Sequence, residues 1–252
     1  MIKDFWFVAP LALAVVATTP ALGQEVNDGW RVTATPYLWA AAYDNDVSNS
    51  ANGHSSDSSA SFFDILDGLS FAFMGKTEIQ YRRAGVMGDI VHMKLKADRT
   101  TSRPILGPVE TESTVANTVV TALGFYRVVE SDDLSVDLLG GLRHVKIKLD
   151  FDVQGPGSGF SRGGSADVTK GTVGVRATKR LGAKTSLTGY GDFSGFGGDV
   201  TVWQLEGTLN YQWSPKLMAF AGYRHFALEI DKDPVSSDVS FSGPIFGTTY
   251  RF

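Results

Sequence analysis

Histidines are the side chains in this 252-residue chain best suited to acid–base chemistry near neutral pH. His144 precedes Lys146, Lys148 and Asp150, His92 precedes Lys94 and Lys96, and His54 lies in a serine-rich stretch. A hydrolase would need a serine nucleophile within about 3 Å of such a base, together with an orienting acid. The sequence has no H-E-x-x-H motif and no cysteine. It therefore identifies no catalytic residue and no metal or cofactor site.

Charged side chains form a second chemically capable set, because they recur at alternate positions of several segments. The candidates are Arg31, Lys76, Glu78, Arg82, Asp89, Arg143, Arg176, Asp192, Glu206, Arg224 and Arg251. Arginines and acids fall on neighbouring segments. If they share a narrow interior, desolvation favours pairing into a salt-bridged filling. The alternative is a charge-lined path for solutes.

The element that positions such side chains is a long β-strand. From Val202 to Trp213, apolar or small residues alternate with polar ones, so that Trp203, Tyr211 and Trp213 share one face. Twelve residues at about 3.3 Å each and a tilt of about 45° cover a bilayer core. The three aromatic residues then form a membrane girdle, with Trp203 and Trp213 near opposite interfaces.

Ten such segments predict an all-β fold, an antiparallel up-and-down transmembrane β-barrel. They are residues 29–43, 70–82, 85–99, 111–129, 134–153, 169–181, 185–195, 200–213, 216–229 and 239–252. Tight turns alternate with longer connections at 44–69, 100–110 and 154–168, the asymmetry expected between periplasmic turns and external loops. Two of the remaining connections are shorter than this asymmetry predicts, so a barrel of eight or twelve strands is also consistent with the sequence.

Two strands break the expected pattern of polar residues inward and apolar residues outward. Asp89 shares its face with Met87 and Val91, and Arg143 shares its face with Leu139, as does Asp137. A charge facing lipid would cost a few kcal/mol at the midplane. Either a bulge shifts the register, or the upper halves of these strands rise above the bilayer. The second interpretation is favoured.

The N-terminus predicts export. Lys3 precedes an apolar run from Phe5 to Ala17, too short to span a membrane, and a small-x-small triplet ends at Gly23. Residues 1–23 are therefore predicted to be a signal peptide and residues 24–252 the barrel domain. The net charge of −4 and the lack of a basic run argue against nucleic-acid binding.

The connection at residues 44–69 is predicted to be a long external loop. Its first part is rich in Ser, Asn and Asp. Phe62, Ile65, Leu66 and Leu69 then follow with helical spacing. The apolar face of this short helix could cap the mouth, fold into the lumen or rest at the membrane interface.

The last segment places Phe246, Tyr250 and the terminal Phe252 on one face. This ending resembles the signal by which outer-membrane barrels are recognised by the barrel-assembly machinery. Most of the mature chain resembles a proteobacterial family of outer-membrane β-barrel proteins of uncharacterised function. The resemblance rests on Pro36–Ala40, Phe63–Leu66, Asp89, Leu138–Arg143, Gly191–Gly197, Trp203, Gln204, Gly222–Arg224, Gly243–Gly247, Arg251 and Phe252. It departs at Val168–Lys170, where the family has Trp-Asp-Pro, and at Ser194, where glycine is usual.

The resemblance implies fold and outer-membrane location but no substrate. The predicted role is structural, or a narrow porin-like passage for small polar solutes. The alternatives are a lipid or peptide hydrolase at the extracellular rim and a surface binding protein. Expected partners are outer-membrane lipid and lipopolysaccharide, whose phosphates could face Lys94, Lys96, Arg99, Lys146 and Lys148. The oligomeric state is left open.

Overall fold

The computed structural model describes residues 29–51, 54–103, 107–155, 158–196 and 198–252. The predicted signal peptide at residues 1–23 lies outside these residues. The elements are β1 (Trp30–Trp39), β2 (Ala42–Asn49), β3 (His54–Ala60), α1 (Phe62–Gly68), β4 (Leu69–Tyr81), β5 (Ala84–Arg103), β6 (Gly107–Glu130), β7 (Leu134–Gly155), β8 (Ser158–Arg180), β9 (Thr185–Ser194), β10 (Val200–Gln212), β11 (Leu217–Lys232) and β12 (Val235–Arg251).

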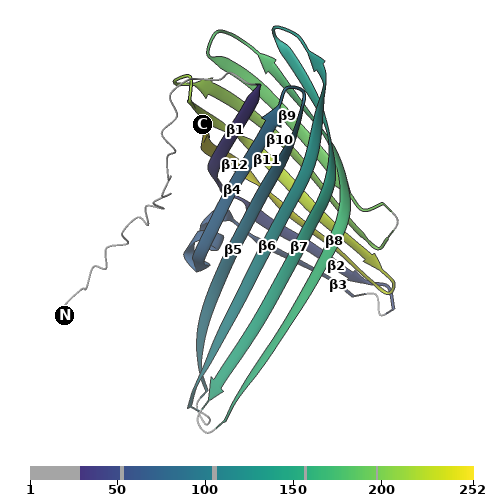
Figure 1. Cartoon of the computed structure of the whole chain (residues 1–252). Helices are drawn as coiled ribbons and strands as arrows, with labels where there is room; N and C mark the ends of the chain where they lie inside the picture. Colours follow the sequence, from purple (N-terminus) through teal and green to yellow (C-terminus); the bar gives the residue numbers. More distant parts are fainter. Residues whose placement is uncertain (1–28, 52–53, 104–106, 156–157, 197) are drawn as a thin grey trace, which may run out of the picture.

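Ten of these strands close into an antiparallel barrel. β1 pairs with β4 through Trp30–Pro36 and with β12 through Thr33–Trp39, which joins the first and last strands of the ring. β4 to β12 follow one another in chain order, and β2 and β3 extend the sheet from β12. The predicted ten-stranded barrel is therefore confirmed, with two additional strands (Figure 1).

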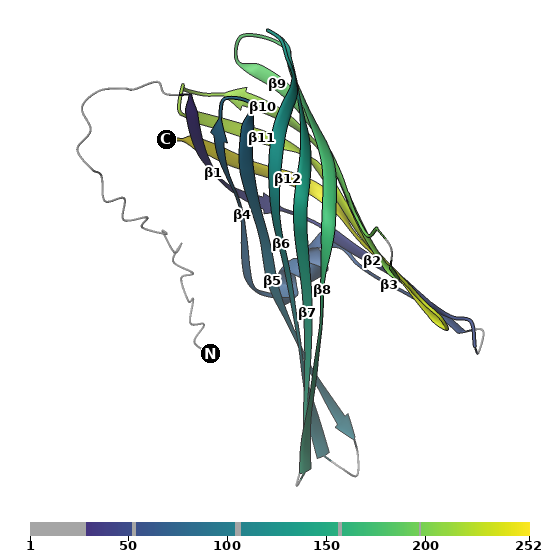
Figure 2. The ribbon, with the colours of Figure 1, turned by 45° about the vertical axis from the view of Figure 1, so that its right-hand side comes forward.

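The two ends of the barrel differ. The start of β1, the C-terminus and the tight turns after β4, β6, β8 and β10 lie together at what we call the terminal end (Figure 1). At the opposite end, the far end, β5 to β8 continue well past the barrel, and β2, β3, β11 and β12 form a second, diverging projection (Figure 2). Short turns at one end and long excursions at the other match the predicted asymmetry.

The long connections predicted at 100–110 and 154–168 are mostly strand. β5 and β6 stay paired as far as Arg103 and Gly107, and β7 and β8 as far as Gly155 and Ser158. The sequence did not indicate these extensions because strands that meet water on both faces do not alternate in polarity.

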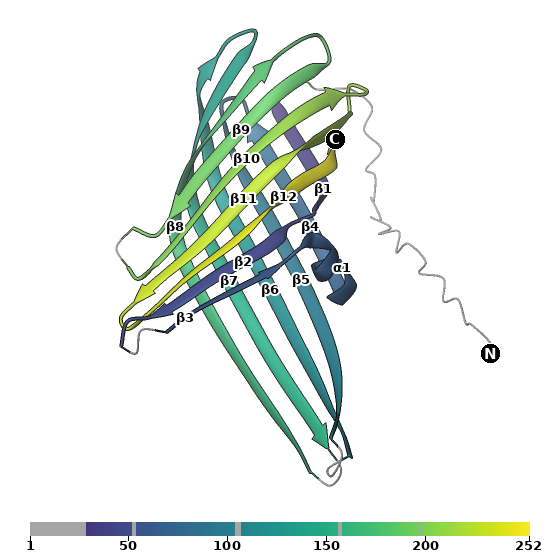
Figure 3. The same ribbon diagram turned by 180° about the vertical axis from the view of Figure 1, so that it is seen from behind.

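The predicted external loop at residues 44–69 also contains regular structure. β2 pairs with Val235–Ser242 of β12, and β3 pairs with β2, so the Ser/Asp-rich stretch is a hairpin. α1 then leads into β4 on the outside of the barrel (Figure 3). The free backbone edge of β12 beyond β1 explains why this polar segment is a strand, since it supplies the hydrogen bonds that water would otherwise make.

α1 confirms the predicted helical segment. A capping box begins it: Asp64 N donates to Ser61 Oγ, and Ser61 N donates to Asp64 Oδ2 at 2.9 Å. Phe62 and Ile65 are half-buried, whereas Phe63 is 73% exposed. In the described part of the chain, no helix is long and apolar enough to cross a membrane.

The outer face of the barrel is apolar. Exposed large hydrophobic side chains recur at alternate positions of successive strands, including Val86, Val120, Leu138, Leu142, Val173, Leu187, Leu205, Leu209 and Phe246. Trp203, Tyr211 and Trp213 point to this face, and the last two rings contact edge to face with centroids 6.4 Å apart. Ten residues separate Trp203 from Trp213, which corresponds to about 23 Å of height for a strand tilted by about 45°.

The inner face explains the two strands that broke the expected pattern. Met87, Asp89, Val91 and Met93 all point into the barrel and are buried. The ladders of β5 run past Asp89 without a register shift, so neither a bulge nor a rise above the bilayer is needed. The expectation of a wholly polar interior was wrong, because a narrow barrel must fill its lumen with side chains of both kinds.

Candidate functional site

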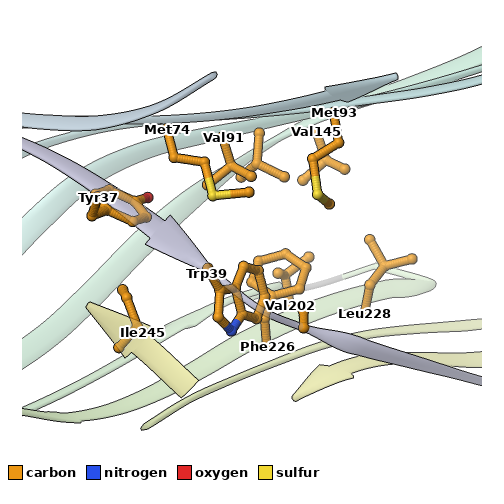
Figure 4. Packing of buried hydrophobic residues seen from close by; sticks show 12 residues of the cluster. Tyr37, Trp39, Met74, Val91, Met93, Val145, Val202, Phe226, Leu228 and Ile245 are labelled. Atoms are coloured by element: carbon orange, nitrogen blue, oxygen red, sulfur yellow. The ribbon is translucent and has the colours of Figure 1, made fainter. Parts of the chain in front are cut away.

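The half of the lumen toward the far end is filled by one apolar cluster, which we call the plug. Its buried members come from β1 and the residues after it, from β4 to β7 and from β10 to β12, and the labelled side chains point toward one another (Figure 4). They are Tyr37, Trp39, Ala41, Met74, Val91, Met93, Val119, Val145, Val202, Phe226, Leu228 and Ile245. Fully burying one large apolar side chain contributes about 1.5–3 kcal/mol. The plug therefore stabilises the barrel while closing it.

A buried ion pair lies against the plug. Arg143 on β7 donates from Nη1 and Nη2 to the two carboxylate oxygens of Asp192 on β9, each at 2.6 Å. Arg143 Nε donates to Thr121 Oγ1 at 3.1 Å, and Tyr190 OH donates to Asp192 Oδ2. The Arg143 and Asp192 side chains are 2% and 0% exposed. Such a bidentate, fully partnered pair is a rigid cross-link inside the lumen.

Arg224 on β11 holds a second buried network. Its Nη1 donates to Tyr37 OH at 2.9 Å, and its Nη2 donates to Gln204 Oε1 at 2.6 Å and to Asp89 Oδ2 at 3.3 Å. Tyr37 OH in turn donates to Asp89 Oδ1 at 2.7 Å. The guanidinium also lies 4.9 Å from the Trp39 ring centroid, so it joins the polar network to the plug.

A third network lies nearer the terminal end. Arg176 Nη1 donates to Glu78 Oε1 at 2.5 Å, and its Nε and Nη2 donate to Asp137 Oδ2 at 3.0 and 2.9 Å. Arg127 Nε donates to the other oxygen of Asp137 at 2.8 Å. Because Asp137 is shared between two arginines, this network ties β4, β6, β7 and β8 together.

A cavity of about 710 Å³ opens at the terminal end, and we call it the vestibule. Its rim includes Arg31 and the turn at Ser131–Asp133, and its inner end includes Lys76, Tyr190 and Glu206. Lys76 Nζ lies 3.7 Å from Glu206 Oε1. Beyond these side chains the lumen contains the plug and the buried networks of Arg143 and Arg224.

Most of the predicted lumen charges meet in these networks. Glu78, Asp89, Arg143, Arg176, Asp192 and Arg224 pair within the barrel, and Glu206 faces Lys76. Arg31 lines the vestibule, and Arg251 lies beside it on β12, where its Cα pairs with Thr33. Arg82 is the exception to the prediction. It occupies the tight turn after β4 with a φ of 53° and lies over the Tyr81 ring, outside the lumen.

Sequence reasoning missed four aromatic or charged members of the networks. Tyr37 and Tyr190 were not singled out, because an aromatic residue on a strand fits a membrane-facing position equally well. Arg127 was not selected on β6. Asp137 was noticed only as a break in the alternation of β7, and that break was the signal that could have placed it inside.

His92, His144 and His225 lie on the outer face, each beside a hydroxyl side chain of the neighbouring strand. His92 Nδ1 contacts Thr118 Oγ1 at 2.7 Å, and His144 Nδ1 contacts Thr169 Oγ1 at 2.9 Å. His225 makes the same cross-strand contact with Ser242 at 2.6 Å. Among the described residues no carboxylate is hydrogen-bonded to any of these rings, and no cluster of potential metal ligands is present. His54 is the first residue of β3.

The aromatic residues of the last strand lie on the outer face. Phe246, Tyr250 and Phe252 are exposed, and the rings of Tyr250 and Phe252 contact edge to face with centroids 5.1 Å apart. Phe252 N donates to Val32 O at 3.1 Å, which fixes the chain end against β1. These positions leave the predicted recognition surface accessible from the membrane side.

The comparisons with known proteins identify the fold. No family model and no curated protein sequence matches the chain. The outer membrane protease OmpT from Escherichia coli matches 88% of this chain and 97% of its own, at 10% identity and a TM-score of 0.58. Ail of Yersinia pestis matches 88% of this chain and 99% of its own, at 14% identity and a TM-score of 0.40. At 10% identity, the likeness to OmpT shows the fold alone: a transmembrane β-barrel like that of this outer-membrane protein.

Proposed function

We propose that this protein is a closed outer-membrane barrel with a structural role, anchoring its long far-end strands at the cell surface and conducting no solute. The plug carries this proposal. The apolar plug favours the predicted structural role over the predicted porin-like passage. A path for polar solutes needs water or polar partners along its whole length.

The polar half of the lumen supports the same proposal. A solute passing Arg143 and Asp192 would have to separate a pair whose two oxygens and three nitrogens are all hydrogen-bonded. Breaking a buried pair by losing one partner costs about 3–5 kcal/mol. Arg224 is held through its two Nη atoms by Tyr37, Gln204 and Asp89. These networks act as struts across the lumen.

The outer surface supports a defined position in the membrane. The terminal end, with its short turns, faces the periplasm in barrels of this kind, and the long strands face outward. Trp213 and Tyr211 then form part of the periplasmic girdle and Trp203 part of the external one. Further out on β7, Lys146 and Lys148 are exposed on the outer face, where lipopolysaccharide phosphates would meet them. Phe246, Tyr250 and Phe252 would present the assembly signal.

Swelling of proteoliposomes in solutions of small sugars and amino acids tests the closed lumen. The wild-type protein should give no more swelling than empty liposomes. A double variant, Phe226→Ala with Trp39→Ala, should allow swelling because it removes two of the three aromatic rings of the plug. Leu205→Ala with Leu209→Ala is the matched control, since both side chains point to lipid. Solute uptake through the wild-type protein would contradict the proposal.

A further inference from the structure

The vestibule combines a size and a lining that suit a small polar ligand. Its volume of about 710 Å³ falls within the range of ligand pockets, roughly 300–1,000 Å³. Hydroxyl and amide side chains line its walls, among them Thr33, Thr35, Thr208 and Asn210. Basic and acidic side chains line it in equal number, so the pocket carries no strong net charge that would select simple anions or simple cations.

Four charged side chains of the vestibule wall are neutralised by close partners. Arg176 binds Glu78 and Asp137, and Arg127 binds Asp137. Lys76 at the inner end differs. Its side chain is 19% exposed, and its nearest carboxylate oxygen, Glu206 Oε1, lies at 3.7 Å, beyond hydrogen-bonding distance. A largely buried ammonium group thus points into the pocket with donors to spare.

Among the described residues, Glu206 lacks a hydrogen-bond donor, just as Lys76 lacks a hydrogen-bond acceptor. Its side chain is 8% exposed, and its Oε2 is buried without a hydrogen-bond partner. Arg224, its cross-strand neighbour, donates from both Nη atoms to Tyr37, Gln204 and Asp89, and its Nε is buried without a hydrogen bond to Glu206 or to any other group in the described part of the chain. A buried acceptor left without a donor destabilises the fold, and more so when it is charged. The inner end therefore offers an ammonium and a carboxylate side by side, each incompletely satisfied.

We propose that the vestibule binds a small zwitterion, an amino acid or short peptide from the periplasm. The ligand's carboxylate accepts hydrogen bonds from Lys76, and its ammonium group donates to Glu206. A lone anion would face the Glu206 carboxylate, and a lone cation would face Lys76, whereas a zwitterion satisfies both at once. The hydroxyl and amide groups of the walls suit the peptide groups of a longer ligand. This site goes beyond the anchoring role, and only the periplasmic source of its ligand rests on the orientation proposed above, since a pocket can bind a ligand without conducting it.

Calorimetric titration of the refolded protein in detergent with glycylglycine tests the site. N-acetyl-glycylglycine lacks the ammonium group, and glycylglycine amide lacks the carboxylate. Each should bind at least about tenfold more weakly than glycylglycine, because one charge-assisted hydrogen bond contributes about 1.5–3 kcal/mol. This comparison uses the wild-type protein and does not depend on any variant folding. Equal binding of the three compounds would overturn the proposal, as would the absence of saturable binding below about 10 mM.

Variants then locate the site. Lys76→Met and Glu206→Gln should each weaken glycylglycine binding about tenfold or more. Lys148→Met and Glu112→Gln are the matched controls, because they alter ion pairs on the far-end strands, and they should leave binding unchanged. The exchanged pair, Lys76→Glu with Glu206→Lys, should retain most of the affinity, since the ligand can bind in reverse. Unchanged binding in folded Lys76→Met and Glu206→Gln would place the ligand elsewhere and refute the site.

Discussion

Replacing Arg143 by methionine should destabilise the folded barrel by about 3–5 kcal/mol. Methionine keeps much of the side-chain length but leaves Asp192, which is fully buried, with Tyr190 as its remaining donor. Two charge-assisted bonds of 2.6 Å are lost, together with the bond to Thr121. Desolvation decides the size of the effect, because water cannot reach the carboxylate to replace the lost donors.

The assay is equilibrium unfolding in urea of the protein refolded into vesicles, followed by tryptophan fluorescence and by electrophoretic mobility without heating. Arg83→Met provides the control. Arg83 pairs with Glu130 at 3.3 Å, but the two side chains are 53% and 47% exposed. Loss of such a surface pair should cost less than about 1 kcal/mol.

A double variant separates the pair from its surroundings. Replacing Arg143 by Met and Asp192 by Leu together should cost less than the sum of the two single changes, by up to about 3 kcal/mol, because no buried charge is then left alone. If Arg143→Met costs no more than Arg83→Met, water enters the lumen at this level, and the closed interior is refuted.

Three further predictions concern the plug, the outer face and α1. Phe226→Ala should lower the free energy of unfolding by about 3–5 kcal/mol through cavity formation, measured in the same urea titration. Leu209→Arg, on the lipid-facing side of β10, should lower it by about 2–4 kcal/mol in vesicles, and a much smaller loss would place this residue outside the bilayer core. The hydrogen bond from the Ser61 side chain holds the pKa of the exposed Asp64 carboxyl below its usual value. The cap therefore stabilises α1 fully at pH values above the unfolded-state pKa of Asp64, and this stabilisation is lost as the pH falls through the lowered pKa of the folded state. In an NMR titration, Ser61→Ala should raise the pKa of Asp64. An unchanged pKa would contradict the capping box.

The membrane-spanning part of the fold was predictable because one face of each strand meets lipid and the other meets the barrel interior. In β10, Leu205 and Leu209 face lipid while Gln204 and Thr208 face the interior, so polarity alternates with the pleat. Beyond the bilayer this contrast disappears. The start of β8 at Ser158, eleven residues before the predicted start, could not be recognised for that reason.

The candidate site was predictable only in part. The charges of Arg143, Asp192 and Arg224 mark them as interior residues, but their partners depend on how the strands are staggered across the lumen, which no single strand encodes. Asp89 and Asp137 appeared to break the pattern because the neighbouring Met87, Val91 and Leu139 were read as lipid-facing. An apolar residue gives the same signal whether it faces lipid or a packed lumen, so the plug emerged only from the assembled barrel.

The conductance of the purified, refolded protein in planar bilayers tests the closed lumen most directly. The wild-type protein should show no channel events over the accessible voltage range, while Phe226→Ala combined with Trp39→Ala should show them in the same membranes. Steady, voltage-independent conductance of the wild-type barrel would contradict the closed lumen.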